Sequence, residues 1–226
     1  LEGVLRAGTN AQGLAREERG LGGDTLVKRG TGMRGRNSGW RVMWLAMWLG
    51  VAMPVAARDV EGVRLLDTVR VMGQPMFLNG AGVRNKFFIK VYVAGLYVSE
   101  RVTSPESVIA SRKPRRIELH MLRNMQASAI HEAMMKGLQD NVSVTELRTL
   151  AAPLARLKQA MTSIGGVSEG DEIQFDFVPG QGTIVRIGGD VRDTIEGDDL
   201  ARALLKIWLG PKPVQDDLKS ALMGAS

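Results

Sequence analysis

The run KFFIKVYVAGLYV, residues 86–98, constrains the fold more than any other part of this chain. One alternate set of its positions is apolar throughout, namely Phe87, Ile89, Val91 and Val93. The other set begins with lysines and becomes apolar after Tyr92. Because side chains of a strand alternate between its two faces, the run predicts a strand with one buried face. Its second face should be exposed to solvent at the start of the strand and buried towards the end. We expect such a strand at the rim of a cleft.

Arg84 lies between this strand and the glycine-rich segment GAG at 80–82, which we interpret with Asn79 as a turn. A charge in this position either ends the strand at the surface or points into a pocket. If no bulge intervenes, Arg84 has the same parity as Tyr92 and lies on the face that passes into cover. A guanidinium there is always charged and can hold a carboxylate through two hydrogen bonds.

The rest of the body predicts an α+β domain without an internal linker. Alternating segments predict strands near 67–78 and 115–123 and a hairpin over 171–189. Helical spacing predicts helices over 126–142, from 143 onward with a kink or division at Pro153, from about 198 to 209, and around 216–223. Together these elements predict an antiparallel sheet with helices gathered on one face.

The front of the chain has the layout of an export signal. Met33 is followed by Arg34, Arg36 and Arg41, then by the apolar run VMWLAMWLGVAM at 42–53, and then by the small-residue ending VAA at 55–57. This order is typical of a cleaved signal peptide, and the apolar run is shorter than the ~20 residues of a membrane-spanning helix. We therefore expect a leader at 1–32, a signal peptide at 33–57, and a periplasmic or secreted domain at 58–226 that begins near Arg58, without a permanent membrane anchor.

Charge and composition exclude several classes of function. The sequence pI is about 9.9, but residues 58–226 hold 22 Lys and Arg against 20 Asp and Glu, so the basic excess lies mostly in the front segment. A nearly neutral body does not predict a nucleic-acid partner. The chain has no cysteine and two histidines, His120 and His131, for which we expect packing or surface roles, so we predict no metal site and no cofactor.

The segment around Arg84 also carries a family resemblance. GAGVR at 80–84 followed by FFIKVYVAGLYV at 87–98 resembles the chalcone isomerase-like family, in which a G-A-G-x-R turn precedes a strand of the form F-x-K-F-T-A-I-G-V-Y-L. The resemblance continues to DTIEGDDLARALLKIWLGPKPVQDDLKSAL at 193–222 and covers nearly all of 60–224. It implies an open-faced antiparallel β-sandwich with a layer of helices on one face and a ligand cleft between sheet and helices.

The resemblance also implies a set of site residues. The true isomerases of this family close a chalcone to a flavanone with the motif arginine, a threonine on the next strand, and a tyrosine and an asparagine on the following helix. Arg84 matches the arginine and Asn141 the asparagine, whereas Tyr92 occupies the threonine position and Met134 the tyrosine position. Thr194 falls near another position of the cleft. These five residues are the expected ligand site, and the two changes indicate a member closer to the non-catalytic or fatty-acid-binding type.

Three functions remain open from the sequence. The first is non-catalytic binding of a small apolar ligand with an acidic or carbonyl group, such as a fatty acid. The second is an intramolecular lyase or isomerase of the chalcone isomerase type acting on an unknown substrate, and the third is a structural or partner-binding role. An open apolar cavity facing Arg84 and Tyr92 would favour a ligand, whereas Arg84 paired with a carboxylate under packed side chains would favour a structural role.

Overall fold

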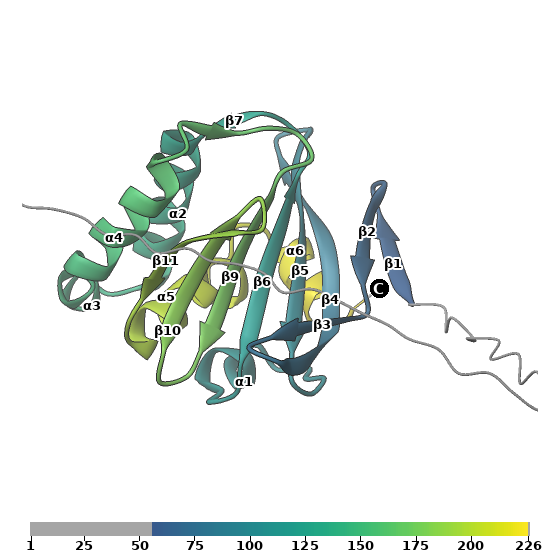
Figure 1. The fold of residues 1–226 in the computed structure, drawn as a ribbon, viewed down its shortest axis with the longest axis horizontal. Coiled ribbons are helices and arrows are strands. Elements are labelled where there is room, and N and C mark those ends of the chain that lie inside the picture. Colours follow the sequence, from purple (N-terminus) through teal and green to yellow (C-terminus); the bar gives the residue numbers. More distant parts are fainter. Residues whose placement is uncertain (1–55, 226) are drawn as a thin grey trace, which may run out of the picture. The chain divides into compact units, whose positions relative to one another are not determined.

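A seven-stranded antiparallel sheet organises the computed structural model, which describes residues 56–225 (Figure 1). Its strands lie in the spatial order β11-β10-β9-β6-β5-β4-β3. Their bounds are β3 Thr68–Val71, β4 Gln74–Lys86, β5 Ile89–Val98, β6 Arg115–Met121, β9 Glu172–Val178, β10 Gly182–Ile187 and β11 Asp190–Ile195. Two short antiparallel pairs stand outside this sheet, β1 Ala57–Val60 with β2 Val63–Leu66, and β7 Met125–Gln126 with β8 Gly166–Val167.

Six helices complete the described part of the chain, and the predicted α+β class with an antiparallel sheet is confirmed. They are α1 Pro105–Ala110, α2 Ala127–Asn141, α3 Val144–Thr149, α4 Ala151–Thr162, α5 Asp198–Leu209 and α6 Asp216–Leu222. The helical segment after Ser143 is divided at Leu150, which leaves Pro153 in the first turn of α4, where its missing N–H costs nothing. Within residues 56–225, none of the helices is both long and apolar enough to cross a membrane.

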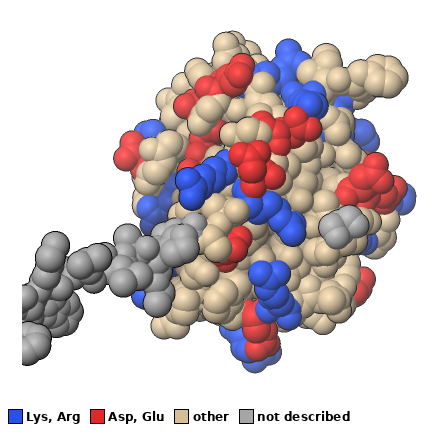
Figure 2. Space-filling view, turned by 90° about the vertical axis from the view of Figure 1, so that its right-hand side faces the viewer, with Lys and Arg blue, Asp and Glu red and all other residues tan. Residues whose placement is uncertain are grey.

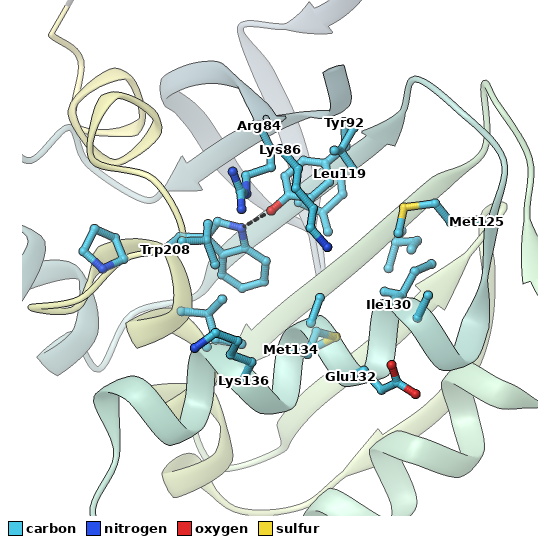
Figure 3. Close-up of a pocket in the computed structure, with 18 of the residues that line it drawn as sticks. Arg84, Lys86, Tyr92, Leu119, Met125, Ile130, Glu132, Met134, Lys136 and Trp208 are labelled. Atoms are coloured by element: carbon cyan, nitrogen blue, oxygen red, sulfur yellow. Dashed lines mark hydrogen bonds between the residues drawn. The ribbon is translucent and has the colours of Figure 1, made fainter. Parts of the chain in front are cut away.

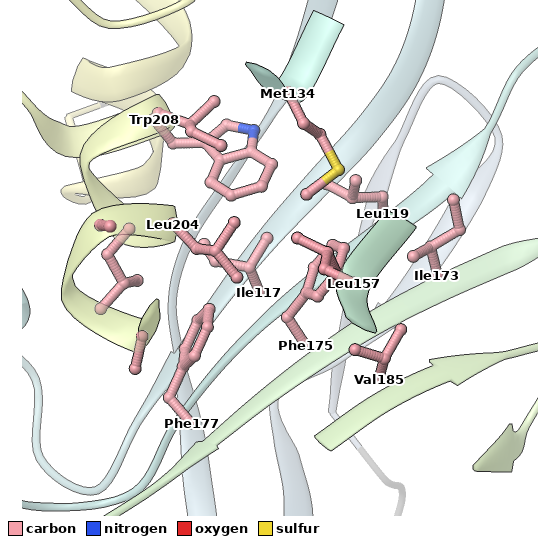
Figure 4. Close-up of a cluster of buried hydrophobic side chains, with 14 of the residues drawn as sticks. Ile117, Leu119, Met134, Leu157, Ile173, Phe175, Phe177, Val185, Leu204 and Trp208 are labelled. Carbon is pink, nitrogen blue, oxygen red and sulfur yellow. The ribbon is translucent and has the colours of Figure 1, made fainter. Parts of the chain in front are cut away.

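The main core lies between the sheet and the helices (Figure 4). Phe175 and Phe177 of β9 point into it, and α5 supplies Trp208. The rings of Phe175 and Trp208 lie 6.3 Å apart between centroids. Full burial of a large apolar side chain contributes about 1.5–3 kcal/mol, so this contact fixes α5 firmly against the middle of the sheet.

The glycines before Arg84 do not form the predicted turn. Asn79, Gly80 and Gly82 all lie inside β4, a continuous strand of 13 residues that packs against α6. A β-carbon on Gly82 would lie 2.7 Å from Cβ of Ala221. A β-carbon on Gly80 would overlap the carbonyl oxygen of Ala221. The prediction of a turn is wrong because these glycines serve the close approach of a helix to a strand rather than a reversal of the chain.

The reversal between β4 and β5 occurs six residues later, inside the run predicted to be all strand. Lys86 pairs with Ile89, so Phe87 and Phe88 form a two-residue turn in which Phe87 has a φ of +50°. The two residues are 84% and 104% exposed. The prediction that Phe87 continues a buried face is therefore wrong, since the tight turn takes both phenylalanines out of the alternation.

The second face of the sheet carries a smaller apolar cluster and a polar network. Leu65 of β2 packs there with Val93 and Tyr97 of β5. Arg116 of β6 binds Asp176 of β9 through two hydrogen bonds, and both side chains are buried. On the surface drawn in Figure 2, Lys and Arg side chains are interspersed with Asp and Glu, in keeping with the nearly neutral body.

Candidate functional site

Arg84 and Tyr92 are brought together by pairing between β4 and β5. They are direct cross-strand partners, so their side chains lie on the same face of the sheet. The register shifts between Arg84 and Asn85, because Asn85 pairs with Lys90 and leaves Val91 as the extra residue of a β-bulge. Through this bulge Val91 and Tyr92, although consecutive, both line the cleft described below.

Arg84 is half-buried and is held by neutral oxygen atoms. Its Nη1 donates to the carbonyl of Asn85 and, at 3.3 Å, to Oε1 of Gln215. The same Gln215 oxygen accepts from the backbone N–H of Asn85 at 2.8 Å, so the segment before α6 fixes the end of β4. Within residues 56–225, no carboxylate lies within ion-pair distance of Arg84. Its positive charge is therefore not neutralised by a described acidic side chain.

The Tyr92 hydroxyl is positioned by Trp208 of α5. The indole Nε1–H donates to Tyr92 Oη at 3.0 Å (Figure 3). Burial raises the pKa of Tyr92 to about 12, although the hydrogen bond from Trp208 and the charge of Arg84 act in the opposite direction. The phenol therefore stays protonated at neutral pH. Because its oxygen accepts from Trp208, its own O–H remains able to donate to a second partner.

A cleft of about 510 Å³ opens beside this pair, between the sheet and helices α2 and α5, and we call it the sheet–helix cleft. Figure 3 shows Arg84 and Tyr92 on the strand side of it and Met134 on α2 opposite. Most of its wall is apolar and comes from Val91, Leu119, Met121, Ile130, Met134, Ile173, Ile207 and Trp208. An apolar hollow of this size with a few convergent polar groups is typical of a small-molecule site.

The charged residues of the sheet–helix cleft are mostly cations. Lys86 and Lys212 line it together with Arg84, while Lys136 lies 2.8 Å from Asp140 on the same helix and is offset by it. Glu132 is the second acidic residue of the lining. With four cations and two carboxylates, the lining favours a negatively charged ligand group over a positive one.

The five residues implied by the family resemblance do not all meet in this cleft. The structure places Arg84, Tyr92 and Met134 in its lining, whereas Asn141 and Thr194 lie outside it. The Asn141 side chain binds the backbone of Lys212 through both of its ends and so holds the segment between α5 and α6. Thr194 is exposed on the edge strand β11. The site that the geometry supports is therefore the Arg84 and Tyr92 pair with the apolar wall.

Trp208 and Gln215 are site residues that sequence reasoning missed. Trp208 falls on the apolar stripe of a helix, a pattern that indicates core, and its polar N–H was the only signal of a second role. Gln215 lies 131 positions from Arg84 and has no local signature. Both contacts form because α5 and the segment before α6 pack against β4 and β5, whose contacting residues lie 131 and 116 positions earlier in the sequence.

A second group of titratable residues lies on the opposite face of the sheet. Glu118 and His120 of β6 and Glu172 of β9 are the one group within residues 56–225 whose ligand atoms all lie within 4.8 Å of one another, close enough to hold a metal ion. His120 Nε2 and Glu118 Oε1 are 2.7 Å apart. Arg116 lies 3.6 Å from Glu118 and opposes a further cation there. The sequence predicted a packing or surface role for His120 and did not identify Glu118, two positions earlier on the same strand face, as its partner.

Comparisons with known proteins agree with this architecture. A crystal structure of a fatty-acid binding protein from Arabidopsis thaliana superposes with a TM-score of 0.58 at 14% sequence identity, covering 75% of this chain and 97% of that one. At this identity the likeness shows the fold. No curated protein matches the sequence. The sequence profile described as chalcone isomerase-like matches residues 57–224, nearly the whole described part of the chain. The chain belongs to the chalcone isomerase-like family.

Proposed function

We propose that the sheet–helix cleft binds a small apolar ligand with an acidic or carbonyl oxygen group, of the fatty-acid class, without converting it. The observation that carries this proposal is the adjacency of Arg84 and Tyr92 at the edge of an apolar cleft. The guanidinium has no described carboxylate partner, and the phenol has a proton to donate, so both can bind one oxygen-bearing head group. The family membership and the fatty-acid-binding neighbour support the same class of ligand.

The tail and the head group have separate roles in this proposal. Each methylene buried against the apolar wall adds about 0.8 kcal/mol, so the tail sets most of the affinity. Hydrogen bonds to a charged group contribute about 1.5–3 kcal/mol each, so Arg84 and Tyr92 set the orientation and the preference for an acid. Burial keeps Tyr92 protonated, which makes it a donor to the ligand and a poor base.

The test compares a long-chain fatty acid with its methyl ester on wild type and on Arg84→Ala. Wild type should prefer the acid, and Arg84→Ala should lose that preference while still binding the ester. Lys136→Ala is the matched control, because it removes another cation of the lining that Asp140 already offsets. If wild type binds acid and ester equally, or if folded Arg84→Ala keeps the preference, the proposed anchor is wrong.

We also propose that the domain is exported, with residues 33–57 removed as a signal peptide. The support is the basic, apolar and small-residue order of that segment, which lies outside the described residues except for Ala56 and Ala57. The family match begins at residue 57, next to the expected junction. Terminal sequencing of protein recovered from the periplasm should start near Arg58. An intact front segment on chain found in the cytoplasm would contradict export.

A further inference from the structure

The two most exposed large apolar residues of the described chain are neighbours in the turn at residues 86–89, which we call the hairpin tip. Phe88 is 104% exposed, Phe87 84% and Ile89 50%. Two-residue hairpin turns favour glycine, asparagine and aspartate, and Phe87 adopts its positive φ without that advantage. Large aromatic residues exposed at such a turn indicate a contact outside the folded domain.

The hairpin tip borders a second hollow that shares lining residues with the sheet–helix cleft. This hollow measures about 420 Å³ and lies between the tip and residues 123–126. Lys86, Val91 and Met125 line both this hollow and the cleft. The exposed phenylalanines therefore stand at the mouth of the apolar site.

The charges at this mouth are positive. Lys86 and Arg123 line the second hollow, and its described lining contains no carboxylate. Lys90, on the other strand of the hairpin, is paired with Glu61 and adds little net charge. Aromatic residues next to unpaired cations are the combination that binds an interface between water and anionic lipid.

We propose that the hairpin tip docks on the surface of an anionic lipid bilayer. Phe87 and Phe88 enter the boundary between head groups and acyl chains, and Lys86 and Arg123 lie against lipid phosphates. Two phenylalanines present roughly 300–500 Å², well below the roughly 800 Å² per partner of a stable protein interface, so the area fits lipid better than a second protein. Docking would place the opening of the sheet–helix cleft at the membrane surface. The docking itself does not depend on the proposed ligand; only the idea that the ligand enters the cleft from the membrane rests on the proposed function.

Site-specific labelling can test this docking on the full chain. The sequence has no cysteine, so Ile89→Cys and Met72→Cys each accept a single environment-sensitive fluorophore. Met72 is the matched control because it is 56% exposed, has a φ of +48° and occupies the two-residue turn at the opposite end of β4. With vesicles of phosphatidylglycerol and phosphatidylcholine, the label at 89 should shift to the blue and brighten, and the label at 72 should not.

Variants then separate the two parts of the surface. In the labelled Ile89→Cys chain, Phe88→Ser should lower partition onto these vesicles about tenfold, and Arg123→Glu about fivefold at low salt. Met72→Ser should leave it unchanged, and vesicles of phosphatidylcholine alone should give a much weaker response. Because all variants keep the front segment, their differences report the hairpin tip.

Three results would overturn docking. The label at 89 could stay in water when the chain is bound to vesicles, both labels could respond equally, or the blue shift could grow with protein concentration without lipid, which would indicate a second copy of the chain. Fatty-acid binding measured without vesicles on the same samples tests the cleft separately, so failure of docking with intact binding leaves the proposed function standing.

Discussion

Replacing Tyr92 by phenylalanine tests the most specific feature of the cleft, because it removes one hydroxyl and keeps the ring. Trp208 is 2% exposed, and its N–H donates to that hydroxyl at 3.0 Å. Without the acceptor, a buried donor loses its partner, which costs about 1–3 kcal/mol. For a domain of this size, the melting temperature should fall by roughly 2 to 12 °C. Loss of one hydrogen bond to a carboxylate should also weaken fatty-acid binding roughly 10- to 150-fold.

The chain provides the control for this variant. Tyr97 is the other of its two tyrosines, is fully buried on the opposite face of the sheet, and its hydroxyl has no partner among the described residues. Tyr97→Phe should therefore leave stability unchanged or raise it slightly, with fatty-acid affinity unaffected.

Urea unfolding and displacement of a fluorescent fatty acid would measure the two effects. Equal stability of the two variants would show that the Trp208 hydrogen bond contributes nothing. Loss of stability in Tyr92→Phe with an unchanged ratio of acid to ester affinity would show that the hydroxyl does not reach the ligand.

Three further predictions follow from other parts of the fold. Gly80→Ala should cost about 3 kcal/mol or more in urea unfolding, because the added methyl overlaps the backbone of Ala221, and a loss below 1 kcal/mol would contradict that packing. Burial lowers the pKa of His120, but its hydrogen bond to Glu118 and the charges of Glu118 and Glu172 outweigh burial and raise it. The contribution of His120 to the unfolding free energy should thus be complete below its unfolded-state pKa and be lost as pH rises through its folded-state pKa. In His120→Gln, the unfolding free energy measured over a pH series should no longer fall over this range. Naringenin chalcone should cyclise no faster with the protein than in buffer, because Tyr92 and Met134 replace the threonine and the tyrosine that the isomerases carry at these positions; saturable turnover in a spectrophotometric assay would refute this.

The sequence predicted that the second face of β5 becomes covered along the strand, because side chains alternate between the two faces wherever a strand is regular. Ala94, Leu96 and Val98 are buried in the main core as expected. Arg84 lies on the same face as Tyr92, as predicted, but not because one regular strand joins them: a hairpin turn and a bulge together bring them opposite each other. A regular two-residue hairpin at Lys86 and Ile89 would place Arg84 opposite Val91, and the bulge moves Tyr92 into that place.

The rest of the site could not be predicted from local pattern. The contact of Trp208 with Tyr92 spans 116 positions and that of Gln215 with Arg84 spans 131, and neither has a periodic signature. The short helix α1 and the edge strand β11 were also absent from the prediction. Both elements are only six residues long, too short for periodicity to distinguish them from loops.

The packing of α6 on the glycines of β4 has a consequence for when the domain can fold. The Asn79 side chain of β4 donates to the carbonyl of Leu222, 143 positions later. Gly80 and Gly82 of the same strand have no side chain where α6 packs against it. Such distant contacts are slow to form, because the loop between them must close first. The strand that carries Arg84 is thus covered by a helix whose contact with it spans 143 positions of the sequence. Until α6 packs against β4, the strand lacks its cover, so Leu218→Ala in α6 should lower the free energy of unfolding measured in urea.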